Sequence, residues 1–236
     1  MVILPHRRKT FRNIASGGSG SDPYFSNVAS LLHFDGADGS TTITDVKGKT
    51  WTAFNQAQID TDQSKFGVSS CLFDGSADYV STPDHADFAL TNQDFTIEGW
   101  VRFASLSGNQ HIFSRWLGGS NQIGFWTGVG FGVYISTTGS NSILAVSYSS
   151  FPATNTWYHY AVCRSGGTIR LYVDGVQQGS SYSIGTSSLY SSTNALAIGA
   201  DALASLNGWH DDFRWSTGVD RYPSNFTPPS SAHPDS

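Results

Sequence analysis

Acidic side chains are where hydrolytic chemistry would first show, and their types and spacing give it little support. Glu98 is the only glutamate among the 18 acidic residues. Hydrolysis of a glycosidic bond needs two carboxyl groups, about 5–5.5 Å apart for retention or about 6.5–9.5 Å apart for inversion. Glu98 lies in the run Phe95–Phe103, which holds no second acid. We therefore predict that Glu98 is structural, paired with a base or with strand-edge donors, and that the chain is not an enzyme.

Nucleophiles and phosphate-binding turns are equally unsupported. The chain has no G-x-S-x-G elbow. The glycine-rich run Gly128–Gly132 is expected to be a closely packed strand, because a nucleotide-binding turn must lead into a helix. Cys71 and Cys163 each lie in an apolar, strand-like run, so we expect buried free thiols. A single bridge between them stays open.

Aromatic side chains are the residues best suited to binding sugars, because a ring face stacks on a sugar while nearby polar groups bond its hydroxyls. Trp100 lies on the face of its strand opposite the expected core. Aromatic residues also fill cores, so each has that second interpretation. The candidates for glycan contacts are Trp100, Trp116, Trp126 and Trp209, with Tyr134 and Tyr148 as further aromatic candidates.

The elements that would position these residues are β-strands. In Phe95–Phe103 apolar residues alternate for nine positions, with Ile97 and Val101 on one face and Glu98 on the other, which predicts a strand. Only 13% of the 236 residues are charged, and 25 are glycine, which argues against helical bundles. We expect about a dozen strands, covering 30–34, 69–73, 95–103, 111–116, 122–126, 131–135, 143–148, 157–164, 168–173, 176–179, 195–199 and 210–215.

These strands predict an all-β sandwich or barrel, since no repeat of 40–50 residues supports a propeller. Asp74-Gly75 and Asp174-Gly175 are expected to supply the positive-φ turns of hairpins. The expected inward-facing residues are Phe73, Ile97, Val101, Ala161, Leu171 and Val173.

Five segments, in order, resemble the laminin-G-like branch of the concanavalin A-like lectin/glucanase superfamily over about residues 28–222. They are Ser70-Cys-Leu-Phe-Asp-Gly-Ser-Ala-Asp-Tyr-Val80, Phe95-Thr-Ile-Glu-Gly-Trp-Val101, Trp157-Tyr-His-Tyr-Ala-Val162, Gly166-Gly-Thr-Ile-Arg-Leu-Tyr-Val-Asp-Gly175 and Gly208–Trp215. The resemblance implies a two-sheet antiparallel jelly roll with one concave and one convex face. The glucanase branch carries E-x-D-x-x-E or E-x-D-x-E on the strand that holds Glu98 here, and the partner acids are missing.

The resemblance also implies that calcium is the realistic ion, because such domains often carry one. Calcium prefers six to eight oxygen ligands. Asp35 and Asp38 on the first turn and Asp211 and Asp212 near the last strand are the candidate ligands. The alternative is ordinary turn and strand-capping chemistry. The seven histidines show no zinc-ligand spacing, and no cofactor is certain.

The termini differ in composition from the centre. We divide the chain into a basic and apolar arm with a Gly/Ser linker (1–27), a sandwich (28–222) and a Pro/Ser-rich tail (223–236). The expected docking residues of the arm are Ile3, Leu4, Arg7, Arg8, Lys9, Phe11 and Arg12. The remaining 9 basic and 18 acidic residues leave the body acidic. No apolar run approaches the ~18 residues of a membrane span, and no secretory signal is evident.

Two functions fit these observations. The first is a non-enzymatic virion component, on a capsid or tail surface, whose arm docks onto a capsid or tail protein. The segment Gly218–Pro229 resembles endings found in tailed-phage structural proteins, which favours this reading. The second is an extracellular or tail-borne carbohydrate-binding module for host-surface glycans. The acidic body disfavours nucleic-acid binding, and a homo-oligomer such as a trimer would protect exposed sheet edges.

Overall fold

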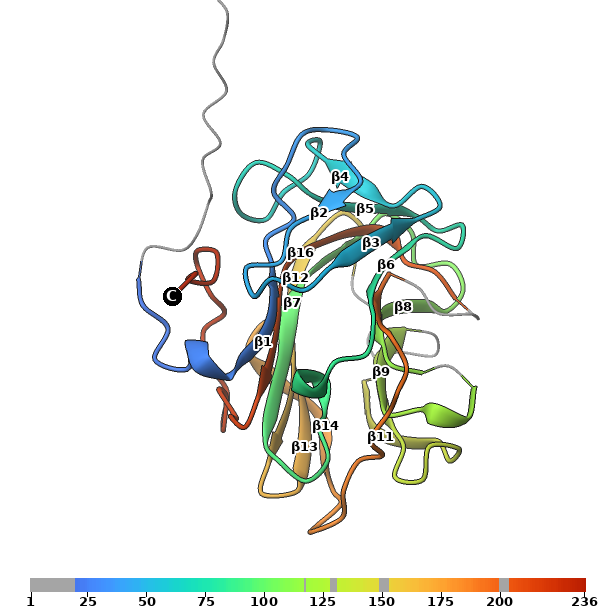
Figure 1. Cartoon of the computed structure of the whole chain (residues 1–236), viewed down its shortest axis with the longest axis vertical. Coiled ribbons are helices and arrows are strands. Elements are labelled where there is room, and N and C mark those ends of the chain that lie inside the picture. The colour runs from blue at the N-terminus through green and yellow to red at the C-terminus, as the bar shows by residue number, and fades with distance from the viewer. Residues whose placement is uncertain (1–19, 117, 128–130, 149–152, 200–203) are drawn as a thin grey trace, which may run out of the picture.

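Two antiparallel β-sheets stack face to face in the computed structural model, which describes residues 20–116, 118–127, 131–148, 153–199 and 204–236 (Figure 1). The chain is therefore an all-β sandwich, as predicted. Sheet A runs β14 (Val176–Ser183), β13 (Thr168–Val173), β12 (Trp157–Ser165), β7 (Phe95–Phe103), β16 (Asn207–Thr217), β5 (Ser70–Asp74) and β4 (Gln58–Asp60), with β1 (Val28–Leu32) also paired to β16. Sheet B runs β11 (Ile143–Tyr148), β10 (Phe131–Ile135), β9 (Ile123–Thr127), β8 (Gln110–Ser114), β15 (Leu196–Ile198), β6 (Tyr79–Thr82), β3 (Trp51–Phe54) and β2 (Thr42–Ile43).

The strands β2, β3, β4 and β6 were not among the predicted ones. All four have only two to four residues with one or two buried positions, too few for a period-two pattern to stand out. The helices among the described residues are three single 3-10 turns, namely η1 (Phe25–Asn27), η2 (Ala86–Phe88) and η3 (Gly118–Ser120). None of these helices has the length or apolar character to span a membrane.

The main core lies between the sheets and follows the predicted alternation. Ile97 and Val101 of β7 are fully buried in it, together with Phe73 and Leu171. The prediction for Ala161 is wrong. Its neighbours Tyr160 and Val162 on β12 face the core, so Ala161 faces the outside of sheet A. There it joins a second, smaller cluster of Cys163 and Tyr172 with Tyr222 and Phe226; Val173 is buried at the end of β13.

The two Asp-Gly turns differ in what they connect. Asp174-Gly175 joins the paired strands β13 and β14, with φ of 48° and 75°, and is the predicted hairpin. Gly75 also has a positive φ of 88°, but β5 belongs to sheet A and β6 to sheet B. Asp74-Gly75 therefore carries the chain between the sheets, and the hairpin prediction for it is wrong. Both cysteines are buried and free, as predicted.

A bulge in β16 decides which of its side chains face outward. The pairing of β16 with β7 shifts register between Asp211 and Arg214, and Asp212 has φ of 48°. A bulge adds one residue and reverses the alternation beyond it. As a result His210 and Phe213 both lie on the core side, while Arg214 faces outward directly opposite Glu98.

The C-terminal residues form part of the domain. The segment expected to be a separate tail, 223–236, continues from β16 across the face of sheet A that points away from sheet B (Figure 1). The amide of Asp22 donates to the Ser236 carbonyl at 2.7 Å, which holds the two ends of the described chain together. We call residues 218–236 the C-terminal strap. The predicted docking residues of the arm, from Ile3 to Arg12, lie outside the described residues.

Candidate functional site

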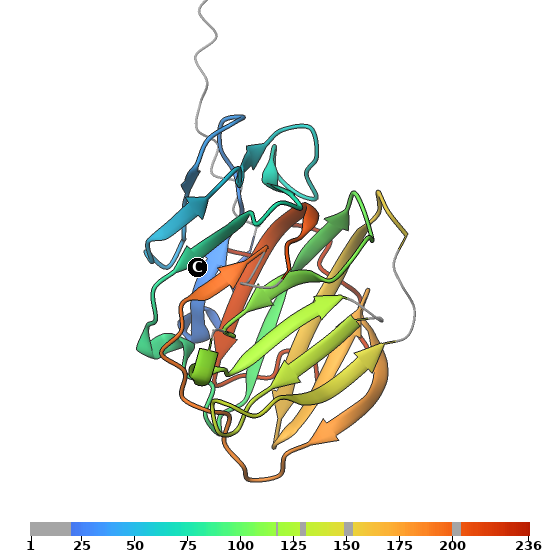
Figure 2. The same ribbon diagram turned by 90° about the vertical axis from the view of Figure 1, so that its right-hand side faces the viewer.

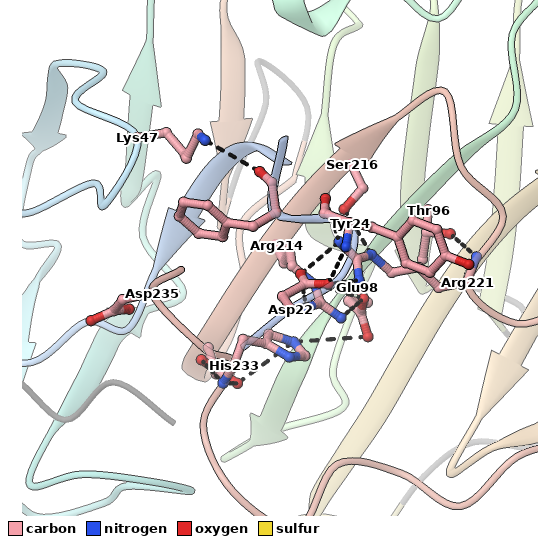
Figure 3. Close-up of polar contacts among 12 residues, drawn as sticks. Asp22, Tyr24, Lys47, Thr96, Glu98, Arg214, Ser216, Arg221, His233 and Asp235 are labelled. Carbon is pink, nitrogen blue, oxygen red and sulfur yellow. Dashed lines mark hydrogen bonds and ion pairs between the residues drawn. The ribbon is translucent and has the colours of Figure 1, made fainter. Parts of the chain in front are cut away.

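The outer face of sheet A carries the glutamate that the sequence singled out, and the strap covers it (Figure 3). Glu98 has no exposed surface. One carboxylate oxygen accepts hydrogen bonds from Nε and Nη2 of Arg214 at 3.0 and 2.7 Å. The other accepts from the Tyr222 hydroxyl at 2.7 Å and lies 3.3 Å from Nε2 of His159. Glu98 is thus paired with a base, Arg214, which is one of the two predicted arrangements.

The electrostatics of this cluster keep Glu98 ionised. Burial is the largest influence and raises the pKa of the Glu98 carboxyl, but Arg214, His233 and His159 together outweigh burial and hold the pKa well below its ordinary value. Arg214 also donates to Asp22 at 3.1 Å. Burial and Arg214 lower the pKa of His233 to about 4, so its imidazole is neutral at pH 7 and its 3.8 Å approach to Glu98 is not an ion pair. A permanently charged, fully enclosed carboxylate is unsuited to donate a proton to a leaving group.

Asp212 holds the end of the strap in place through hydrogen bonds to His33 and to the His233 amide. One of its oxygens lies 2.7 Å from Nδ1 of His33, and both oxygens accept from the His233 amide, at 3.0 and 3.3 Å. Nε2 of His33 lies 2.8 Å from Asp235. Burial lowers the pKa of His33, but Asp212 and Asp235 together raise it to about 9. The imidazole is therefore a cation that bridges β16 to the strap.

The four predicted calcium ligands do not form one cluster. Asp211 accepts from the amides of Lys65 and Phe66, at 2.7 and 3.1 Å, and burial raises its pKa well above the ordinary value. Asp35 and Asp38 accept from other backbone amides, those of Val68 and Thr61 at 3.2 Å. In the described part of the chain, no three His, Cys, Asp or Glu side chains are grouped to hold a metal ion.

One strip of the outer face of sheet A is covered by no segment among the described residues. The cross-strand register places Leu72 of β5 beside Trp209 of β16, Trp209 beside Arg102 of β7, and Arg102 beside Trp157 of β12. All four side chains are half-buried, with part of each open to solvent. We call these four residues the open row. It presents an indole on each side of a guanidinium, on a rigid sheet.

Polar groups border the open row. The Arg102 guanidinium lies 5.2 Å from the Trp209 ring, and its Nη1 donates to Asn155 Oδ1 at 2.7 Å. The Trp209 indole donates to Asp60 at 2.6 Å, which fixes the ring. Hydrogen-bonding groups beside an aromatic surface are the features that a sugar requires.

Trp100 is buried instead of exposed. Only 4% of it is accessible, and it packs against Phe66 and His159 with ring centroids 5.7 and 5.2 Å away. Lys65 Nζ lies 3.8 Å from the Trp100 ring centre. The alternation of β7 correctly places Trp100 on the outer face, but the loop that carries Lys65 and Phe66 covers it.

Of the other two candidate tryptophans, Trp126 lies on β9 of sheet B, which faces the viewer in Figure 2, and Trp116 lies two residues beyond the end of β8. Trp126 is stacked between His111 and Tyr134, with centroids 4.8 and 3.9 Å away and planes within 10°. Trp116 meets Trp126 at 80° and 5.8 Å. Both faces of Trp126 are thus occupied by other rings, and it has no free face for a sugar. Tyr148, at the end of β11, is half-buried against the main core.

The structure therefore brings one predicted tryptophan, Trp209, into an open aromatic surface. No pattern in the sequence had indicated that Arg102, Trp157 or Asn155 could contact a glycan. The alternation of β7 already placed Arg102 outward. The strand order and register could not be predicted from the sequence, because no local pattern shows that β16 and β12 lie on either side of β7.

Comparison with known proteins agrees with this architecture. The binding domain of Paraclostridial Mosquitocidal Protein 1 superposes with a TM-score of 0.65 at 13% identity, over 84% of this chain and 51% of that one. The botulinum neurotoxin serotype D binding domain gives 0.64 at 13% identity, over 83% and 49%. This chain thus spans about half the length of those toxin domains.

A third structure matches over nearly its whole length. Domain 4 of AbnA, a GH43 extracellular arabinanase from Geobacillus stearothermophilus in complex with arabinotriose, gives a TM-score of 0.62 at 16% identity, over 81% of this chain and 93% of that one. No curated protein sequence matches. A family profile described as the concanavalin A-like lectin/glucanases superfamily, of laminin-G type, matches residues 74–219. The chain therefore belongs to the concanavalin A-like lectin/glucanase superfamily.

Proposed function

We propose that this chain is a non-catalytic carbohydrate-binding domain that holds glycans on the open row. The observation that carries the proposal is the arrangement of Trp209, Arg102 and Trp157 on the part of sheet A that the strap leaves uncovered. Side chains on paired strands are held in place by the sheet, so little conformational entropy is lost when a ligand binds. The similar arabinanase domain, crystallised with arabinotriose, supports a sugar as the class of ligand.

The proposal includes the absence of glycoside hydrolysis. Glu98 occupies the strand position at which the glucanase branch carries its acids, and here it is enclosed by Arg214, Tyr222 and the rest of the strap. Incubation with β-glucans, agarose and alginate should release no reducing ends. Turnover that Glu98→Gln abolishes would refute this part of the proposal.

Binding is tested with a glycan array followed by calorimetry on the full chain. Trp209→Ala and Trp157→Ala should each weaken binding about 5–30-fold, since loss of an aromatic contact costs about 1–2 kcal/mol. Trp116→Ala removes an equally large ring from sheet B and should leave the affinity unchanged. Equal losses in all three variants, or binding to no glycan on the array, would refute the site.

We also propose that the domain is displayed on a virion surface, or otherwise outside the cell, through its N-terminal arm. The support is the basic, apolar composition of residues 1–12 on an otherwise acidic chain. Deletion of residues 1–19 keeps Asp22, which contacts Arg214 and Arg221 in the fold. The truncated protein should fold normally and lose attachment to particles. Full decoration by the truncated protein would show that the arm is not the anchor.

A further inference from the structure

The open row and the residues beside it carry two cations that form no ion pair with a carboxylate of the described chain. The described polar contact of the Arg102 guanidinium is with the neutral amide of Asn155, and its other neighbour is the Trp209 ring. Lys65 Nζ lies 3.8 Å from the Trp100 ring centre, and Asp174 and Asp211 act on Lys65 electrostatically without forming an ion pair with it among the described residues. On this same face, the arginines that stabilise the fold form ion pairs with carboxylates, Arg214 with Glu98 and Arg221 with Asp22.

The two cations lie close together. Trp100 and Arg102 are two residues apart on one face of β7, which places their backbones about 7 Å apart. Trp209 and Trp157 are direct cross-strand neighbours of Arg102, with Cβ separations of about 4.5–5.5 Å. Tryptophans are therefore the cross-strand neighbours of Arg102 on both sides, and a second cation lies over the Trp100 indole of the adjoining row.

Three acids border the open row, and each already accepts a hydrogen bond from a neutral protein group. Asp60 accepts from the Trp209 indole, and Asp174 accepts from the His159 amide at 2.9 Å. Asp211 accepts hydrogen bonds from two backbone amides, and burial raises the pKa of its carboxyl well above the ordinary value. Asp174 is near enough to Lys65 to act on it electrostatically, and burial lowers the pKa of Lys65. Within the open row, Arg102 is thus a cation that forms no ion pair with a described carboxylate, on a chain of net charge −5.

We propose that the ligand of the open row is an acidic glycan, recognised by a carboxylate on Arg102 while the sugar ring stacks on Trp209 or Trp157. This rests on the proposed carbohydrate-binding function and names the class of its ligand. Arg102 uses one Nη1 hydrogen for Asn155, so Nε and Nη2 remain as a planar pair of donors that matches a carboxylate. In uronic and sialic acids the carboxylate is attached to the sugar ring itself, so a ring stacked on an indole places it beside the guanidinium.

The experiment compares matched glycans that differ in the carboxylate. Calorimetry on the full chain would use oligogalacturonate against its methyl ester, and sialyllactose against lactose. The two pairs distinguish a uronic acid from a sialic acid. The acidic member of one pair should bind at least about tenfold more tightly than its neutral partner, with an affinity that falls as salt is raised.

Variants separate recognition of charge from folding. Arg102→Gln should reduce binding of the acidic glycan about tenfold and remove its preference over the neutral partner, with an unchanged melting temperature. Arg170→Gln alters another half-buried arginine of sheet A, on β13 and outside the open row. It should change neither the binding of the acidic glycan nor the preference for it over the neutral partner.

The outcomes for the two proposals are distinct. Equal affinity for acidic and neutral glycans, lost in Trp209→Ala but not in Arg102→Gln, would overturn the acidic-glycan inference and leave carbohydrate binding standing. Failure of every acidic and neutral glycan to bind would refute both. Preference for the carboxylate that persists in Arg102→Gln would place recognition of the charge at another residue.

Discussion

Replacing Glu98 by glutamine tests whether this residue holds the fold together. The substitution keeps the size of the side chain and removes its charge. Arg214 would lose the carboxylate that accepts its 2.7 and 3.0 Å hydrogen bonds and keep only Asp22, at 3.1 Å. Removing one partner of a buried ion pair typically costs about 3–5 kcal/mol. Because Asp22 remains, and because the Tyr222 hydroxyl can turn to accept from the new amide, we expect about 3 kcal/mol.

Urea unfolding at several pH values measures this effect. A loss of about 3 kcal/mol corresponds to roughly 6–12 °C in melting temperature for a domain of this size. The folded pKa of Glu98 lies below its unfolded value, so the stability that its charge contributes is present above about pH 4.5 and is lost as the pH falls through the folded pKa. The difference between wild type and Glu98→Gln should therefore stay constant from about pH 8 to about pH 5 and shrink only in stronger acid.

A matched control separates enclosed from exposed carboxylates. The side chain of Asp235 is 39% exposed, and its Asn variant should cost less than about 1 kcal/mol. Equal small losses in Glu98→Gln and Asp235→Asn would refute the argument that Arg214 depends on Glu98. So would a difference between wild type and Glu98→Gln that disappears already near neutral pH.

Three further predictions concern the strap and the acids of β16. His33→Gln should cost up to about 3 kcal/mol near pH 6, because the folded pKa of about 9 lies above the unfolded value, and the loss should vanish as the pH rises through about 9. Gly175→Ala should cost about 2 kcal/mol and expose the strap to proteases, because φ is 75° and a Cβ there would lie 1.9 Å from the Phe226 carbonyl oxygen. Calcium and EDTA should leave the melting temperature unchanged, because both Asp211 and Asp212 already hold internal partners.

Each of these three predictions has an outcome that would contradict it. If the loss of folding stability in His33→Gln did not depend on pH, the positive charge of His33 would not contribute to that stability. Gly166→Ala is the control for Gly175, since its φ is 53° but a Cβ meets nothing within 4 Å; equal effects would show that contact with the strap is unimportant. A calcium-dependent rise in melting temperature would show that the two aspartates rearrange around an ion.

Much of the fold was predictable because its long strands carry, at alternate positions, the apolar residues that face the main core. Phe95–Phe103 shows a period of two over nine residues, and its inward face was predicted correctly. Shorter strands such as β2 and β4 have too few residues for a pattern. The turn at Asp74-Gly75 has the composition of a hairpin, yet it connects two sheets, and local composition cannot distinguish these two uses of a positive φ.

The candidate site was less predictable because it depends on which strands become neighbours. The residue types alone established an all-β chain, a lone glutamate without a catalytic partner, two thiols in apolar runs and an outward-facing Arg102. The tertiary structure decided that the last 19 residues lie over Glu98, that Trp126 has both faces covered, and that Trp209 and Trp157 flank Arg102. Alternation within a strand is a local property of the backbone, whereas strand order and register come from contacts between segments more than 50 residues apart, which no single stretch of sequence contains.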